Sequence, residues 1–193
     1  FFNLEDNITL ETDLLKFVIN FVLENNFSDL LFLQNRKKED EKAKKNDLDL
    51  INFLKTIVEK NFQRITYSQA IEILKNEKYN FEKKINDWGD ELQSEHERFL
   101  VENYFKNVTV VTDYPKQLKA FYMRQNEDKK TVAAMDILVP CIGEIIGGSQ
   151  REERLDFLLD SINFFKINQD SIKWYIETRK FGSIIHSGFG LGL

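Results

Sequence analysis

The sequence predicts an α+β fold, with helices around a mainly antiparallel sheet, and three observations lead to this prediction. Apolar residues recur at helical spacing in several segments before residue 106 and again after residue 150. Residues 119–139 have the pattern of two strands joined by a polar turn. The chain has 193 residues, of which 42% are hydrophobic and 17 are Phe, enough to build a core.

The helices are predicted from apolar stripes and from their starting residues. Three segments begin like capping boxes, in which the first and fourth residues bond each other's backbone. These pairs are Thr66 with Gln69, Ser94 with Glu97, and Ser149 with Glu152. The predicted helices span residues 9–25, 28–33, 48–61, 66–75, 94–105, 150–165 and 170–180.

The strands are predicted from β-branched and alternating segments that end at turn residues. Asn126 and Asp128 supply turn chemistry at 125–130, and Pro140 ends the following strand because it has no N–H to donate. The two-residue period places Val132, Ala134, Asp136 and Leu138 on one face. The predicted strands span residues 108–111, 119–124, 131–139, 143–148 and 182–193.

Two carboxylates occupy unusual positions in this predicted sheet. Asp136 lies mid-strand among apolar residues, and Glu144 begins the next strand, although acidic residues are poor strand formers. With Arg151 nearby, the pair is typical of a site for a divalent cation and a polar ligand. The alternative is that both carboxylates face solvent from an open side of the sheet.

The last strand has glycine at alternate positions, Gly188, Gly190 and Gly192, so all three lie on one face. A face without side chains lets a flat ligand lie directly against the backbone. Close packing of the strand on a helix is an equally good explanation of these glycines.

Composition and motifs exclude several classes of protein. The net charge of −5 is unlike that of a nucleic-acid-binding domain, and the single cysteine, Cys141, allows no internal disulfide. No apolar run reaches the ~18 residues that a membrane span needs. Phosphate-binding glycine loops, zinc-ligand spacing and a Ser-His-Asp signature are missing from the sequence. The two histidines, His96 and His186, are interpreted as structural.

Residues 35–49, NRKKEDEKAKKNDLD, form a low-complexity charged segment. Its lysines could contact RNA phosphate, but the acidic residues cancel most of their charge. A solvated insertion is the better interpretation, because the segment has little apolar surface to bury.

Four stretches together resemble the catalytic domain of the asparaginyl-tRNA synthetases, which are class II enzymes of the aspartyl/asparaginyl/lysyl subgroup. The stretches are WGDELQSEHERFLVENYFK, DYPKQLKAFYMRQNEDKKTVAAMDILVP, GEIIGGSQREERLD and HSGFGLGL, and they follow the family's order over residues 88–193. The resemblance continues more weakly over residues 1–87. It implies a class II core, an antiparallel sheet flanked by helices, that is incomplete in this chain, so residues 1–193 are expected to be part of a longer catalytic domain.

The resemblance also implies a reaction and a set of site residues. Asparagine and ATP would form asparaginyl-adenylate, and the asparaginyl group would pass to tRNA(Asn). Asp136 and Glu144 match the carboxylates that hold ATP and Mg²⁺, and Gly188, Gly190 and Gly192 match the glycine strand against which ATP packs. Arg151 matches the reader of the asparagine side chain. An arginine pairs even better with a carboxylate, so discrimination against aspartate needs a separate acceptor for the amide NH₂.

The chain departs from the family pattern in a few places. Glu91 stands where the family usually places an aspartate near the substrate's ammonium group, and Cys141 and Ile185 replace a family Gly and Pro. The first two class II motifs, the anticodon-binding barrel and an arginine after Leu193 lie outside this sequence. We therefore expect the chain alone to be inactive, and a homodimeric parent enzyme, cytosolic or organellar, to be the catalyst. An aspartyl-tRNA synthetase, a synthetase-like asparagine synthetase and a non-catalytic synthetase-derived binding module are the alternatives.

Overall fold

The computed structural model describes residues 3–39 and 49–192, which divide into two compact units. One unit contains the residues through Thr9 and those from Gln63 onward, and the other contains Leu10–Phe62. Helix α1 (Leu4–Asn25) runs from one unit into the other. None of the helices in these described residues is long and apolar enough to cross a membrane.

The smaller unit is helical, as its apolar spacing predicts. It contains most of α1 together with α2 (Phe27–Glu39) and α3 (Leu50–Glu59). Asp49 caps α3 by accepting a hydrogen bond from the Asn52 N–H at 3.1 Å. Residues 35–39 of the charged segment belong to α2, whereas residues 40–48 lie outside the described residues. The solvated insertion therefore stays a prediction.

The larger unit is built on a five-stranded sheet in the order β1-β2-β3-β4-β5. Only β1 and β2 pair in parallel, and the other three pairings are antiparallel, which confirms the predicted mainly antiparallel sheet. Strand β1 is not predicted from the sequence, because its short polar segment precedes a helix without a turn signal. The strands are β1 (Gln63–Thr66), β2 (Thr109–Pro115), β3 (Thr131–Val139), β4 (Gly143–Gln150) and β5 (Ser187–Leu191).

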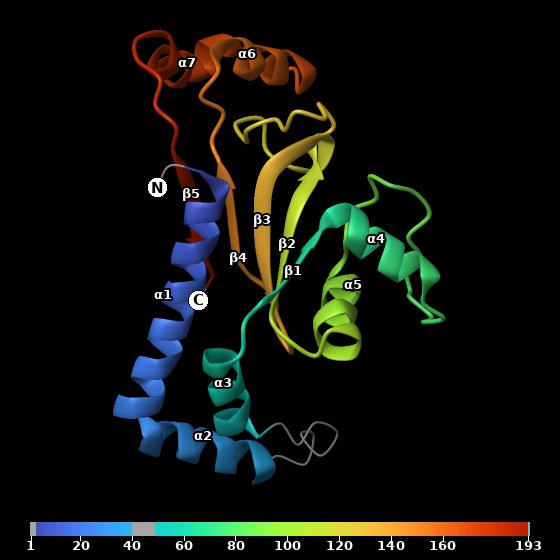
Figure 1. Ribbon diagram of the computed structural model, residues 1–193, viewed down its shortest axis with the longest axis vertical. Helices are drawn as coiled ribbons and strands as arrows, with labels where there is room; N and C mark the ends of the chain where they lie inside the picture. Colours follow the sequence, from blue (N-terminus) through green and yellow to red (C-terminus); the bar gives the residue numbers. More distant parts are fainter. Residues whose placement is uncertain (1–2, 40–48, 193) are drawn as a thin grey trace. The chain divides into compact units, whose positions relative to one another are not determined.

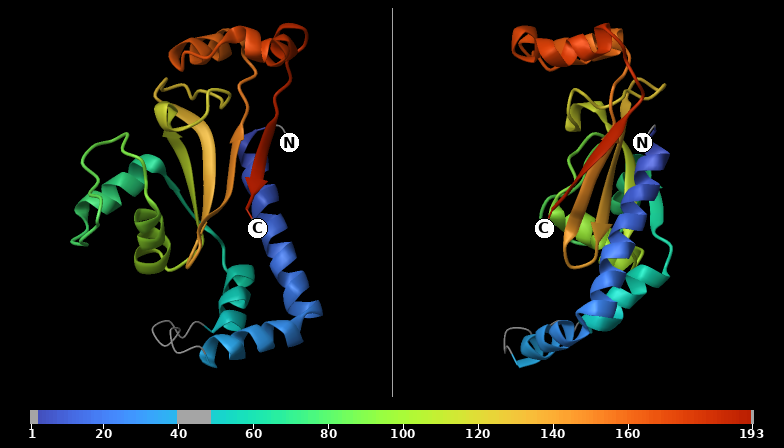
Figure 2. Two further views of the ribbon diagram at one scale, coloured as in Figure 1. Left: turned by 180° about the vertical axis from the view of Figure 1, so that it is seen from behind. Right: turned by 90° about the vertical axis from the view of Figure 1, so that its left-hand side faces the viewer.

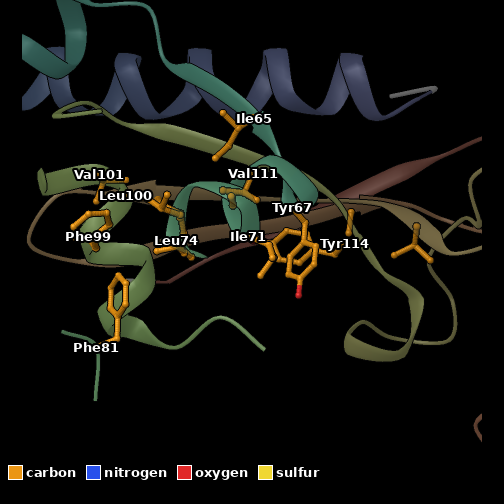
Figure 3. Packing of buried hydrophobic residues seen from close by; sticks show 14 residues of the cluster. Ile65, Tyr67, Ile71, Leu74, Phe81, Phe99, Leu100, Val101, Val111 and Tyr114 are labelled. Carbon is orange, nitrogen blue, oxygen red and sulfur yellow. The ribbon is translucent and has the colours of Figure 1, made fainter. Parts of the chain in front are cut away.

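The core of this unit lies between one face of the sheet and the helices that follow β1 and precede β2. Figure 3 shows aromatic and aliphatic side chains of α4 (Tyr67–Asn76) and of the π-helix η2 (Phe99–Tyr104) gathered beside β2. Val132, Ala134 and Leu138 of β3 belong to the same cluster, as their predicted shared face requires. The predicted capping box at Thr66 and Gln69 is present at the start of α4.

The predicted helix at 94–105 is a short α5 (Ser94–Arg98) followed by η2. The cap differs from the predicted pair of Ser94 and Glu97, because Gln93 is the N-cap and its N–H donates to His96 Nδ1 at 2.9 Å. His96 is fully buried, and its Nε2 lies 2.7 Å from the Lys83 carbonyl oxygen. The ring therefore joins two backbone segments, in keeping with a structural histidine.

Two predictions near the centre of the chain are wrong. Ser149 does not cap a helix but lies in β4, where the antiparallel partners β3 and β5 extend the strand to Gln150. Glu152 is buried and accepts the Gln125 N–H at 2.9 Å. Residues 119–124 do not form a strand, because the short 3-10 helix η3 (Lys116–Leu118) turns the chain and leaves only the bridge from Met123 to Arg151.

The segment between β4 and β5 lies beyond the ends of these strands (Figures 1 and 2). The helix predicted to start at residue 150 starts at Leu155 instead, because β4 continues to Gln150. The elements are α6 (Leu155–Phe164), the 3-10 helix η4 (Gln169–Ile172) and α7 (Lys173–Lys180).

Candidate functional site

The pairing register places three site residues in one row across the sheet. Asp136 of β3 pairs with Gly147 of β4, and Gly147 pairs in turn with Gly190 of β5. Paired residues project to the same face of a sheet. Asp136 therefore stands beside two positions that have no side chain, and this leaves open space next to its carboxylate.

A bulge in β4 brings Glu144 to this same face. Glu144 lies three residues before Gly147, so regular alternation would send its side chain to the opposite face. The register shifts between Ile137 and Leu138, and Glu144 pairs with Leu138, which faces the same way as Asp136. The extra residue in β4 therefore turns the Glu144 side chain to the same face as Asp136.

The two carboxylates converge on one point above Gly147. A Cβ built on Gly147 would lie 2.5 Å from Glu144 Oε1 and 3.3 Å from Asp136 Oδ1. Any larger residue at 147 would occupy the space that these two oxygens share. The pair predicted from the sequence is thus assembled, with an oxygen of each residue facing the same small volume.

Asp136 is held from its other side by Lys119 and Tyr114. Lys119 Nζ lies 2.6 Å from Asp136 Oδ2 and 4.0 Å from the centroid of the Tyr114 ring. Burial, followed by the nearby Asp136 carboxylate, raises the pKa of Tyr114 well above its usual range. Tyr114 therefore remains a neutral phenol beside Asp136 at ordinary pH.

Glu97 of α5 is a third carboxylate at this site that the sequence analysis did not assign to it. It accepts a hydrogen bond from the Glu144 backbone, and a Cβ on Gly143 would lie 3.1 Å from Glu97 Oε2. Partial burial first, and then Glu144, raise the pKa of Glu97. Burial and then Asp136 likewise raise the pKa of Glu144. Three acids facing one ammonium make this a site that attracts cations.

The donor set fits a divalent cation that is shared with a ligand. Among the residues described, no group of three or more His, Cys, Asp or Glu is arranged to hold a metal ion by itself. Asp136 and Glu144 together offer two hard oxygen ligands at one point. Mg²⁺ is commonly bound in this way, by one or two carboxylates while phosphates and water complete its octahedron.

Arg151 lies at the other end of the glycine-lined face. Its guanidinium stacks over the Tyr122 ring at 4.7 Å, and its Nη1 donates to the Ser149 hydroxyl. A Cβ on Gly188 would meet Arg151 Nη2 at 3.3 Å, so the arginine extends across the glycine strand. Of the carboxylates that the structure describes, none forms an ion pair with Arg151, which leaves its charge available for a ligand.

The glycines of the last strand have different surroundings. Nothing lies within 4 Å of a Cβ built on Gly190, whereas Gly188 is covered by Arg151 and a Cβ built on Gly192 would lie 3.9 Å from the Ile145 carbonyl oxygen. Gly190 and Gly147 are adjacent across the β4–β5 pair. The open floor of the site is therefore at Gly190, with the two carboxylates above the adjacent Gly147 and Arg151 above Gly188.

A family model described as tRNA synthetases class II (D, K and N) matches residues 1–193. The chain belongs to this family. It is 49% identical to an asparagine–tRNA ligase of Cytophaga hutchinsonii over 192 residues, and 49% identical to that of Borreliella burgdorferi over 193 residues. Each alignment covers 100% of this chain but only 39% and 40% of the relative, so the chain spans about two fifths of their length.

Solved structures of class II synthetases give the same result. The asparaginyl-tRNA synthetase of Pyrococcus horikoshii, complexed with asparaginyl-adenylate, matches with a TM-score of 0.83 and 35% identity. The match covers 100% of this chain and 40% of that one. The resemblance to asparaginyl-tRNA synthetases noted in the sequence, and the expected class II core, are both confirmed.

Two positions singled out as departures from the synthetase pattern have distinct geometries. Glu91 is exposed, and its Oε2 accepts a hydrogen bond from Gln93 Nε2 at 3.3 Å. Cys141 is exposed and has a φ of 70°, in the left-handed region that favours glycine. The glycine that the resemblance implies at this position would adopt this turn without strain.

Proposed function

We propose that the full-length protein containing this chain is an asparaginyl-tRNA synthetase, which activates asparagine with ATP and transfers it to tRNA(Asn). The observation that carries the proposal is the convergence of Asp136 Oδ1 and Glu144 Oε1 above Gly147, beside the open glycine floor. The 49% identity to asparagine–tRNA ligases supports asparagine as the amino acid. The expected parent enzyme is a homodimer, in the cytosol or an organelle.

We assign the carboxylate end of the site to ATP. Asp136 and Glu144 would hold Mg²⁺ together with the ATP phosphates, and the open floor at Gly190 would receive the nucleotide. Bound Mg²⁺ supplies stabilisation of the negative charge that develops on the phosphates. The protein's own contribution is to orient the two reactants and to aim both carboxylates at one point.

We assign the Arg151 end to the asparagine side chain. The Tyr122 ring and the Ser149 hydroxyl fix the guanidinium, so its remaining donors can bond the amide carbonyl of the substrate. Glu91 is the proposed partner of the substrate's ammonium group. The acceptor for the amide NH₂, which would exclude aspartate as a substrate, is assigned to the part of the protein outside this chain.

The experiment is ATP–pyrophosphate exchange by the full-length protein with asparagine and with aspartate side by side. Exchange with asparagine alone is the expected result. Exchange with aspartate would reassign Arg151 as a carboxylate clamp and overturn the asparaginyl proposal. A folded protein that binds ATP but exchanges with neither would identify a non-catalytic relative. The isolated 193-residue chain is expected to show no exchange.

A further inference from the structure

Lys119 has no role in the sequence analysis, yet it makes one of the closest polar contacts at the site. Its ammonium lies 2.6 Å from Asp136 Oδ2, and the side chains of Lys119 and Asp136 are only 18% and 6% exposed. The ammonium also lies over the Tyr114 ring, 4.0 Å from the ring centroid. Lys119 is thus held between an anion and an aromatic face, which restricts it far more than a surface lysine.

The two oxygens of Asp136 consequently have different surroundings. Oδ2 accepts the ammonium of Lys119, whereas Oδ1 points toward Gly147 and the Glu144 carboxylate. An aspartate side chain rotates easily about its last torsion, so an unrestrained carboxylate would exchange or tilt its oxygens. A partner fixed on one oxygen prevents this rotation.

We propose that Lys119 is a positioning residue that holds Asp136 Oδ2 and thereby presents Oδ1, together with Glu144 Oε1, to the divalent cation. This inference rests on the proposed function of the site as the metal–ATP end. Outer partners of metal ligands act in this way, and their removal typically weakens metal binding by ~10–100-fold. Tyr114 contributes through its ring, which lies against the ammonium, and through its hydrogen bond to Asp136.

A different role for the same lysine would have the opposite effect. A positive charge close to a cation site repels the cation, so a lysine that merely neutralised Asp136 would weaken metal binding. Its removal would then tighten metal binding. The sign of the change therefore distinguishes positioning of Asp136 from competition with the metal.

The test compares Lys119→Met with Lys116→Met in the full-length protein. Lys116 is the matched control. Its ammonium also lies over an aromatic ring, that of Phe164 at 4.9 Å, and the residue is three positions before Lys119 in the chain. Binding of Mn²⁺ in the presence of ATP is measured by electron paramagnetic resonance. The Mg²⁺ dependence of asparagine-dependent pyrophosphate exchange and the melting temperature are measured on the same samples.

We expect Lys119→Met to raise the Mn²⁺ dissociation constant and the half-saturating Mg²⁺ concentration by ~10–100-fold. Exchange at saturating Mg²⁺ should recover toward the wild-type rate, and Lys119→Arg should restore part of the metal affinity by keeping a charged donor. Lys116→Met should match wild type. Unchanged or tighter metal binding in folded Lys119→Met would overturn the inference, as would a lower rate with an unchanged metal dependence.

The two proposals fail in different ways. Absence of asparagine-dependent exchange in the wild-type protein would refute the proposed function. Because Mn²⁺ binding does not depend on the amino acid, the comparison of Lys119→Met with wild type would still decide the role of Lys119.

Discussion

Gly190→Ala tests the assignment of the glycine floor to the nucleotide. Nothing lies within 4 Å of a Cβ at this position, and Gly190 does not have the positive φ that only glycine tolerates easily. The methyl group should therefore cost the free protein nothing. Loss of glycine's freedom in the unfolded chain should even stabilise the fold by ~0.4–1 kcal/mol.

The same methyl should obstruct a flat ligand that packs on the floor. An extra methyl in a well-packed contact typically costs ~1–3 kcal/mol. Since ~1.4 kcal/mol corresponds to tenfold in affinity, the KM for ATP should rise by ~5- to 150-fold. The KM for asparagine should change little, because the change lies away from the Arg151 end.

The assay is pyrophosphate exchange by the full-length protein over a range of ATP concentrations, with thermal unfolding of the same sample. Gly147→Ala is the companion variant, because its Cβ would lie 2.5 Å from Glu144 Oε1 and displace a carboxylate as well. The Gly147→Ala variant should therefore bind the divalent cation more weakly, in addition to having a higher KM for ATP. A folded Gly190→Ala protein with the wild-type KM for ATP would refute the assignment of the floor.

Three further predictions concern charge, amino acid binding and the core. Glu97→Gln should melt at a higher temperature than wild type at pH 7 without metal, because burial and Glu144 raise the pKa of Glu97 and so penalise its charged form in the folded state. The difference should shrink as the pH falls through the raised pKa toward the ordinary value of 4.5, and a difference independent of pH would contradict the assignment. Arg151→Lys should raise the KM for asparagine by roughly 10- to 100-fold while the KM for ATP stays constant, because lysine lacks the planar fork of donors and a charge-assisted bond contributes ~1.5–3 kcal/mol. An equal rise in the KM for asparagine and in the KM for ATP would instead indicate a general disturbance of the site. Leu138→Ala should lower the free energy of unfolding by ~2–5 kcal/mol in urea titrations, because the side chain is fully buried in the core cluster. A loss below ~1 kcal/mol would mean that the core relaxes around the cavity.

The sequence predicts much of the larger unit, because several of its signals are local. Alternation and Pro140 give the bounds of β3 correctly, and the capping pair of Thr66 and Gln69 marks the start of α4. The shared face of Val132, Ala134 and Leu138 follows from the two-residue period and is observed in the core. Where a local signal competes with sheet pairing, as at Ser149, the ladder prevails and the capping prediction fails.

The sequence by itself determined the family, the mainly antiparallel sheet and the identity of the acidic pair, because these depend on residue types in order along the chain. Only the tertiary structure decided how the pair is arranged. The bulge that turns Glu144 to the face of Asp136 depends on the pairing of β3 with β4. Likewise, Lys119, Tyr114 and Glu97 surround the pair only after η3, β2 and α5 have packed against it. Register and packing join residues far apart in the chain, and no local pattern records which of them will meet.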